Sequence, residues 1–174
     1  MIIGRPGSGK STFSIHLQQA LNIPVIHLDK YYFTNHWQPI AHENFVKILK
    51  QFISQPKWII EGCSTKTYEL RFNEADICIY LDISKWVCLY RLFKRFYIRH
   101  PAIDDRALGC NESLSWALIK YLWNFTRKVS PILSQLKQKY PKVKFITIKN
   151  NREGVALIKA LLVEPNKELN YIVN

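Results

Sequence analysis

The sequence predicts an α/β fold in which helices flank a parallel β-sheet. Short apolar segments rich in β-branched residues alternate along the chain with longer segments whose apolar residues have helical spacing. The apolar segments are nearly continuous, which is typical of strands buried on both faces of a parallel sheet. The 174 residues are enough for one domain with a single core, so we expect one domain over 1–174.

Five strands and six helices are expected in alternating order. The strands are 1–3, 25–28, 57–61, 77–82 and 143–148, and the helices are 10–21, 42–54, 65–73, 84–99, 113–140 and 152–162. Pro131 is expected to kink or divide the fifth helix, because proline lacks an amide hydrogen and clashes with the preceding turn. The polar segment 101–112 is expected to form a loop between two long helices, giving a lid over about 95–115.

The composition is strongly basic, with a net charge of +12 and an isoelectric point of about 9.6. Such a surface attracts polyanions, which include nucleic acid, acidic lipid and phosphorylated small molecules. No acidic residue occurs from Ser113 to Arg152, and the lysines within 137–144 are interpreted as a solvated helix face. No apolar run reaches the roughly 18 residues that span a bilayer and no signal-peptide pattern is present, so we expect a cytoplasmic protein without a membrane partner.

Four cysteines are present: Cys63, Cys78, Cys88 and Cys110. No pair has the C-x-x-C spacing of a metal or redox site. We expect reduced structural thiols, with Cys78 and Cys88 acting as small core residues.

The segment GRPGSGKS, from Gly4 to Ser11, fits the pattern G-x-x-x-x-G-K-[ST] of a phosphate-binding P-loop. Gly7 and Gly9 allow backbone amides to turn inward around a phosphate, and the following helix offers its N-terminal amides to the same anion. Lys10 would reach the β- and γ-phosphates, and Ser11 would offer a hydroxyl to Mg²⁺. We therefore expect ATP and Mg²⁺ to be bound by Gly4, Arg5, Pro6, Gly7, Ser8, Gly9, Lys10, Ser11 and Thr12.

Three carboxylates follow expected strands: Asp29, Glu61 and Asp82. Ligands of open α/β sheets bind beyond the C-terminal ends of the strands. Glu61 is expected to hold Mg²⁺ through water with Ser11, and Asp29 to orient or deprotonate a phosphoryl acceptor. The stretch after Asp29, which includes Trp37, would form an acceptor pocket, whereas Asp82 is interpreted as a cap of the next helix.

Arg91, Arg95 and Arg99 recur every four residues, so they lie along one face of the expected helix 84–99. With Arg106 in the adjoining loop they would bring positive charge over transferring phosphates, because guanidinium groups form paired hydrogen bonds with phosphate. The alternative is a solvated basic face. Two further arginines are expected to contribute to acceptor binding: Arg71 and Arg127.

Aromatic residues of two expected helices are interpreted as core. In the helix 84–99 the set with helical spacing is Trp86, Leu89, Tyr90, Phe93, Phe96 and Tyr97. In the next helix it is Trp116, Tyr121, Trp123 and Phe125. A base-stacking platform is the alternative for this second set.

The segments GRPGSGKST, HLDKYYF, WIIEG, ADICIYLD, CLYRLFKR and GCNE together resemble the family named "DNA topology modulation protein", whose members look like adenylate-kinase-type P-loop kinases. The resemblance implies a three-layer P-loop NTPase fold with strand order 2-3-1-4-5 and an ATP/Mg²⁺ site at 4–12. It implies that Arg91 and Arg95 contact adenine and phosphates, and that 150–154 packs the adenine ring. Glu61-Gly62 resembles an Asp-Gly pair of these kinases, but Cys63-Ser64-Thr65 replaces their Phe-Pro-Arg, which leaves the acceptor open.

These observations favour an ATP-dependent small-molecule kinase that acts on a nucleotide or nucleoside-like acceptor. The expected catalytic residues are Lys10, Asp29, Glu61, Arg95 and Arg99, and the expected acceptor-binding residues are Asp29, Trp37, Arg71, Arg106 and Arg127. One alternative is a nucleotide-regulated DNA-binding protein, although no helix-turn-helix, zinc finger or basic arm is present. Another is a P-loop ATPase switch that uses no acceptor.

The expected first strand is short for its position. A strand that leads into a P-loop is normally central, buried and about five residues long, whereas only three residues precede Gly4. The sequence therefore predicts either that the native start lies upstream of Met1 or that the first strand is truncated and weakens the sheet.

Overall fold

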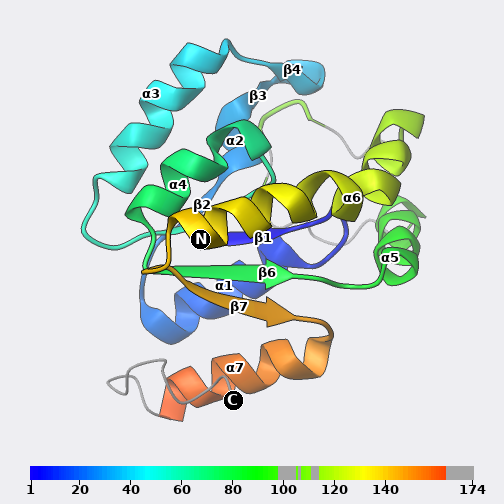
Figure 1. Cartoon of the computed structure of the whole chain (residues 1–174). Coiled ribbons are helices and arrows are strands. Elements are labelled where there is room, and N and C mark those ends of the chain that lie inside the picture. The colour runs from blue at the N-terminus through cyan, green and yellow to red at the C-terminus, as the bar shows by residue number, and fades with distance from the viewer. Residues whose placement is uncertain (98–104, 106, 111–113, 164–174) are drawn as a thin grey trace.

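The computed structural model describes residues 1–97, 105, 107–110 and 114–163. A five-stranded parallel sheet lies at the centre, with helices on both of its faces (Figure 1). Its strands are β1 (Ile2–Gly4), β2 (Val25–His27), β5 (Ile59–Glu61), β6 (Ile77–Leu81) and β7 (Lys144–Ile148). The strand order is β2-β5-β1-β6-β7. The predicted fold class, the number of parallel strands and their order 2-3-1-4-5 are confirmed.

The six expected helices are present at nearly the expected bounds: α1 (Lys10–Leu21), α3 (His42–Ile53), α4 (Tyr68–Glu74), α5 (Lys85–Tyr97), α6 (Trp116–Lys139) and α7 (Asn151–Val163). Pro131 was expected to kink or divide its helix; α6 continues through Pro131, so it is not divided there. Four short elements were not expected: α2 (Leu28–Tyr32), β3 (Phe33–Thr34), η1 (Asn35–Trp37) and β4 (Gln38–Pro39). The start of the expected helix 65–73 is a 3-10 helix, η2 (Thr65–Thr67), directly before α4. None of the described helices is long and apolar enough to cross a membrane.

The sheet separates two apolar cores, and neighbouring residues of β1 point into different ones. Ile2 packs with Phe13 and Leu157, from the helices α1 and α7. Ile3 packs with Phe72 and Phe125, from α4 and α6 on the opposite face. This alternation follows from the two-residue side-chain period of a strand, and it explains why the run is apolar throughout.

β1 is short but fully integrated into the sheet. It pairs in parallel with β5 on one side and β6 on the other. The pairing extends to Met1, whose carbonyl accepts a hydrogen bond from Ile79 N at 2.9 Å. The Met1 amino group donates to Ile77 O at 2.6 Å. Burial lowers the pKa of this amino group to about 6.

The predicted packing of the α5 aromatic residues on the core is wrong. The buried residues of α5 are Cys88 and Leu92. The exposed ones include Trp86, Tyr90, Phe93, Phe96 and Tyr97. With 3.6 residues per turn, Cys88 and Leu92 lie on the opposite side of the helix from Trp86 and Tyr90, and only that opposite side meets the sheet.

The interpretation of the α6 aromatic residues as core holds for two of the four. Phe125 is buried and Tyr121 packs against the same core cluster. Trp116 and Trp123 are exposed. All four cysteines are free, as expected, and Cys78 and Cys88 are buried.

Candidate nucleotide site

The loop between β1 and α1 has the backbone conformation that a phosphate-binding loop requires. Gly7 and Gly9 have φ angles of 76° and 91°, in the left-handed region that favours glycine. A Cβ atom at Gly7 would lie 2.5 Å from the Cys88 carbonyl oxygen, so the loop packs closely on the backbone of α5. Gly9 precedes α1 without a side-chain cap, which leaves the first amides of this 12-residue helix available to an anion.

Lys10 lies inside this loop, where its Nζ donates to Arg5 O at 3.3 Å. Burial lowers the pKa of Lys10, but Cys63, Glu61 and Asp29 raise it by more, so the net shift is upward. Since burial also raises the pKa of Cys63, this thiol is neutral near pH 7. We therefore attribute the stabilisation of the Lys10 cation to the two carboxylates.

Ser11, Glu61 and His27 form a hydrogen-bonded group at the C-terminal edge of the sheet. Ser11 Oγ donates to Glu61 Oε1 at 3.2 Å. His27 Nδ1 lies 2.8 Å from the same oxygen. His27 and Glu61 are register partners in the neighbouring strands β2 and β5, which brings the two side chains together. Glu61 itself is buried.

The oxygen atoms Ser11 Oγ and Glu61 Oε1 are hard ligands of the kind that Mg²⁺ prefers. Among the residues that the structure describes, no three His, Cys, Asp or Glu side chains group to hold a metal by themselves. The residues therefore fit a magnesium ion that keeps several waters and arrives with a phosphate chain.

Asp29 lies in the first turn of α2, directly after β2. Asp29 is exposed to solvent. Desolvation, followed by the negative charge of Glu61, raises the pKa of Asp29 to about 6.

Two contacts tie the segment after β5 to the phosphate loop and α6. Cys63 Sγ donates to Gly4 O. Tyr121 OH donates to the Cys63 carbonyl at 3.4 Å. No local sequence pattern indicates these contacts or the role of His27, because they depend on how segments far apart in the chain come together.

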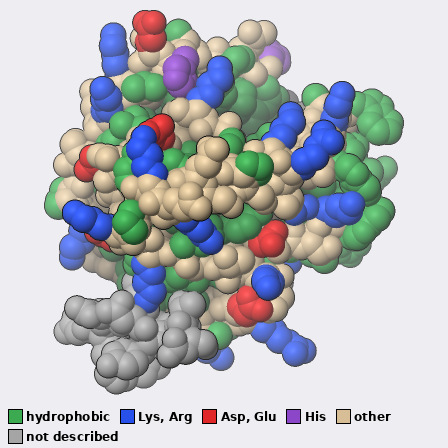
Figure 2. Space-filling model, in the orientation of Figure 1, with side chains coloured by type: hydrophobic (Ala, Val, Ile, Leu, Met, Phe, Trp, Pro, Cys, Tyr) green, Lys and Arg blue, Asp and Glu red, His purple; other side chains and the backbone are tan. Residues whose placement is uncertain are grey.

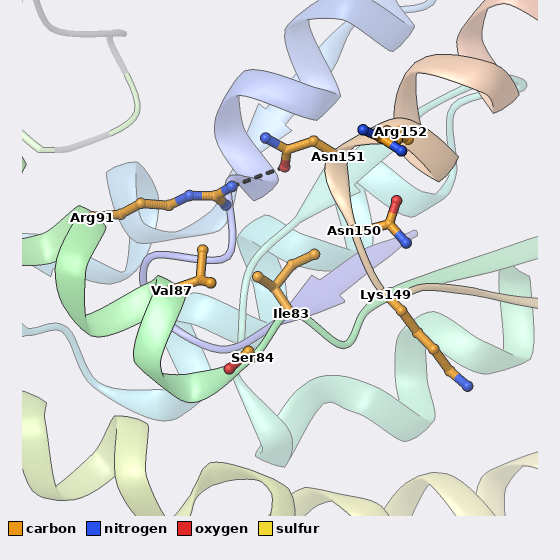
Figure 3. Close-up of a pocket in the computed structure, with 8 residues that line it drawn as sticks. All are labelled: Ile83, Ser84, Val87, Arg91, Lys149, Asn150, Asn151 and Arg152. Carbon is orange, nitrogen blue, oxygen red and sulfur yellow. Dashed lines mark hydrogen bonds between the residues drawn. The ribbon is translucent and has the colours of Figure 1, made fainter.

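A surface pocket of about 450 Å³ lies beside the loop. It is lined by Ile83, Val87 and Arg91 on one side and by Asn150, Asn151 and Arg152 on the other (Figure 3). Arg91 connects it to the phosphate loop, because its Nη1 donates to Ser8 O at 3.1 Å. Its Nη2 donates to Asn151 Oδ1 at 2.8 Å, the contact drawn in Figure 3. The predicted positions Arg91 and 150–154 therefore meet at one pocket.

Two predicted site arginines are buried in structural contacts. The Arg5 side chain turns away from the loop, pairs with Asp82 at 3.7 Å and donates to Thr126 Oγ1. Asp82 thus forms an ion pair with Arg5, a contact that was not expected when Asp82 was interpreted as a helix cap. Arg71 is fully buried and donates to the carbonyls of Gly62 and Ser64 at 3.2 and 3.1 Å. It therefore stabilises the segment that follows β5 and is not accessible to an acceptor.

The remaining predicted residues lie further from this group. Trp37 is half-buried in η1, with its ring 5.2 Å from that of Phe33. Arg95 is exposed on α5, and Arg127 is exposed on α6. Arg99 and Arg106, with most of the expected lid, lie outside the described residues.

No family model matches the sequence, and no curated protein matches it, so membership of the DNA topology modulation proteins is not confirmed. Several solved structures are similar. A deoxyadenosine kinase from M. mycoides with the products dCMP and a flexible dCDP bound has a TM-score of 0.52 and 17% identity, over 95% of this chain and 99% of that one. The same enzyme with dATP bound has a TM-score of 0.51 and 17% identity, over 94% and 100%.

A protein from Chloroflexus aurantiacus, provisionally assigned as a kinase, has a TM-score of 0.50 and 13% identity, over 96% of this chain and 97% of that one. These likenesses establish the fold. The whole described chain shares the α/β architecture of these proteins, with its five-stranded parallel sheet.

Proposed function

We propose that the protein is an ATP-dependent small-molecule kinase that transfers the γ-phosphoryl group of ATP to a nucleoside-like or nucleotide acceptor. The observation that carries this proposal is the 3.2 Å contact between Ser11 Oγ in the phosphate loop and Glu61 Oε1 at the end of β5. It unites the hydroxyl and the carboxylate that a phosphoryl-transfer site uses for its metal, next to the lysine of the same loop.

On the donor side, the amides of the loop and the Lys10 ammonium bind the β- and γ-phosphates. The pocket between α5 and the β7–α7 segment would take the adenine ring, with Arg91 between ring and phosphates. Lys149 N and Asn150 Nδ2 both donate to the Glu153 carboxylate, at 2.7 and 2.5 Å, so this side of the pocket is held in shape without a ligand.

Ser11 and Glu61 would hold Mg²⁺ with its waters, and His27 keeps the Glu61 carboxylate oriented toward Ser11. When bound, the ion supplies charge that offsets the negative phosphate oxygens. Arg95 and Arg99 are proposed to add positive charge from the end of α5.

On the acceptor side, Asp29 would accept the proton that the acceptor hydroxyl loses when its oxygen attacks the γ-phosphorus. Trp37 and Arg106 are proposed to bind the rest of the acceptor. The similar deoxyadenosine kinase supports a nucleoside-like acceptor, since it combines this fold with that activity in its name.

The test is single-turnover ATP consumption against a panel of nucleosides, nucleoside monophosphates and phosphorylated metabolites, with product analysis. We expect one acceptor class to accelerate ATP consumption strongly, and Lys10→Ala to abolish it while the fold is retained. Lys47→Ala on the exposed face of α3 is the matched control and should leave turnover unchanged. Unchanged ATP consumption in Lys10→Ala would refute the proposal, and water as the sole acceptor would identify an ATPase switch instead.

A further inference from the structure

One side of α5 is an exposed aromatic stripe. Trp86, Tyr90, Phe93 and Tyr97 are spaced by four, three and four residues, which places them on the same side of a helix. All four are exposed, and Tyr97 retains 76% of its accessible surface. A helix of a folded domain normally buries such a stripe, and a large exposed apolar patch often marks an interaction site.

Helix α6 presents a second stripe with the same spacing, in which aromatic and basic residues alternate. Its members are Trp116, Lys120, Trp123 and Arg127, and all are exposed. Trp116 is 85% exposed. The stripe lies opposite the buried side of α6, so its exposure is a property of the packed helix.

Direct contacts join the two stripes. The rings of Trp86 and Trp123 meet edge to face, with their centroids 5.1 Å apart. Lys85 Nζ lies 3.8 Å from the centroid of the Trp123 ring. We call the combined surface the aromatic-basic face: Lys85, Trp86, Tyr90, Phe93, Tyr97, Trp116, Lys120, Trp123 and Arg127. Figure 2 shows hydrophobic side chains gathered beside Lys and Arg at the right edge of the molecule, over α5.

We propose that the aromatic-basic face binds single-stranded nucleic acid. Exposed Trp and Tyr rings provide stacking surfaces for unpaired bases, and interleaved Lys and Arg side chains neutralise the phosphates. The charges are complementary, because neither α5 nor α6 contains an acidic residue in its described length. Neither stacking nor phosphate contact reads the sugar, so DNA and RNA strands are expected to bind alike.

Other occupants fit this face less well. A second copy of the chain would oppose cation to cation across the interface, which costs free energy. A membrane would have to take up Lys120 between Trp116 and Trp123, in the middle of the face. Duplex DNA offers the phosphates but keeps its bases stacked on one another, so the aromatic rings would gain little. The proposal does not depend on the proposed kinase activity.

The test uses fluorescence anisotropy of a labelled thymidine oligonucleotide of roughly 20 nucleotides, longer than one ordinary single-strand site. Trp116→Ala is expected to weaken binding about tenfold, within the range for loss of one stacking ring. Trp116→Phe should retain most of the affinity, whereas Trp116→Leu, which stays apolar but cannot stack, should lose it. A thermal melt verifies that each variant is folded.

Charge is tested by a matched pair of reversals. Lys120→Glu lies within the face, and Lys47→Glu makes the same change at an exposed position of α3. Lys120→Glu should weaken binding and reduce the slope of log K against log salt by roughly 0.7 or more, the value for one lost single-strand phosphate contact. Lys47→Glu should have the smaller effect, and equal effects of the two reversals would overturn the proposal.

Three further results would overturn it. One is affinity for a matched duplex equal to or above that for the single strand. Another is binding to phosphatidylserine vesicles that is lost in Trp116→Leu while the oligonucleotide does not bind at all. The last is a dimer in sedimentation that Trp116→Ala dissociates, which would identify the face as a contact between two copies.

Discussion

His27 contacts the buried Glu61 carboxylate at 2.8 Å, on the oxygen that also accepts a hydrogen bond from Ser11. Partners behind a metal-binding carboxylate typically contribute 10- to 100-fold to metal affinity or activity. We therefore expect His27→Ala to need at least about tenfold more Mg²⁺ for half-maximal ATP turnover.

Titration of turnover with Mg²⁺ measures this shift for His27→Ala. His16→Ala, at an exposed position of α1, is the control and should behave as wild type. If both variants respond to Mg²⁺ like the wild type, His27 has no role in the proposed metal site.

Asp29 predicts a pH dependence of activity. Desolvation raises its pKa to about 6, so the charged carboxylate that we propose as the proton acceptor is lost as pH falls through that value. We expect kcat/KM to fall on the acid side with a midpoint near pH 6. Measurement of kcat/KM between pH 5 and 8 tests this, and an acid limb near the ordinary carboxyl value would contradict it.

The same shift predicts the sign of a stability effect. Because the folded-state pKa of Asp29, about 6, lies above its ordinary value of 3.8, the charged form disfavours folding at high pH. Asp29→Asn should therefore melt at a higher temperature than wild type at pH 8 and have little turnover. The difference in melting temperature between the two proteins should disappear as pH falls from about 6 to 3.8. No gain in melting temperature at pH 8 would show that the charged Asp29 carboxylate does not destabilise the fold.

At the scale of single residues, a local sequence pattern was enough to place some of the predicted residues at one site, whose chemistry remains a proposal. The glycines, Lys10 and Ser11 follow from one loop pattern, and Glu61 follows from its place at the end of a strand. Arg71 could not be placed, since a buried arginine that donates to carbonyls has the same sequence signature as an exposed one. His27 required the register between β2 and β5, which no local pattern contains.

At the scale of elements, the phosphate loop depends on its fit against α5. Gly7→Ala would add a methyl group 2.5 Å from the Cys88 carbonyl oxygen, at a φ of 76°. We expect a loss of about 2 kcal/mol in the free energy of unfolding, together with loss of ATP binding. Gly154→Ala, in the first turn of α7, is the control for stability, because its Cβ would meet no atom closer than 3.5 Å.

The control variant should be stabilised by about 0.5–1 kcal/mol, since alanine favours a helix over glycine. Urea unfolding and a binding titration with ATP compare the two variants. Equal stability of Gly7→Ala and Gly154→Ala would contradict the close packing of the loop on α5.

The types and order of the elements could be predicted from the sequence, but which side of a helix packs against the sheet could not. Apolar residues occur on two sides of α5, the aromatic residues on one and Cys88 and Leu92 on the other, and spacing alone does not say which side meets the sheet. In the structure, the side with Cys88 and Leu92 is buried. The small elements between β2 and α3 escaped prediction because two-residue strands form only through their mutual pairing.

At the scale of the whole molecule, a net charge of +12 on one domain implies self-repulsion in the folded state. Salt shortens the reach of this repulsion, from about 30 Å at 0.01 M to about 10 Å at 0.1 M. We expect the melting temperature in HEPES buffer to rise with potassium chloride over this range. Phosphate buffer is avoided because it would bind the loop, and a flat or falling curve would contradict the prediction.

The fold could be predicted as a whole because each apolar strand, each helix and the P-loop agree with one architecture. The acceptor could not, since the pocket proposed for it involves the irregular segment after β2, and the shape of such a segment depends on tertiary contacts. The exposure of Trp116 and Trp123 could not be predicted either, because it depends on how α6 packs against the sheet and beside α5.

Arg91 has a further consequence for the energetics of the proposed donor site. One guanidinium bonds both the phosphate loop, at Ser8 O, and the pocket, at Asn151 Oδ1. Two parts of a ligand that share such an anchor do not bind independently, because the first part to arrive has already restricted the side chain for the second. Adenosine and triphosphate are therefore expected to be cooperative halves of one ligand, bound more tightly together than the product of their separate affinities would give.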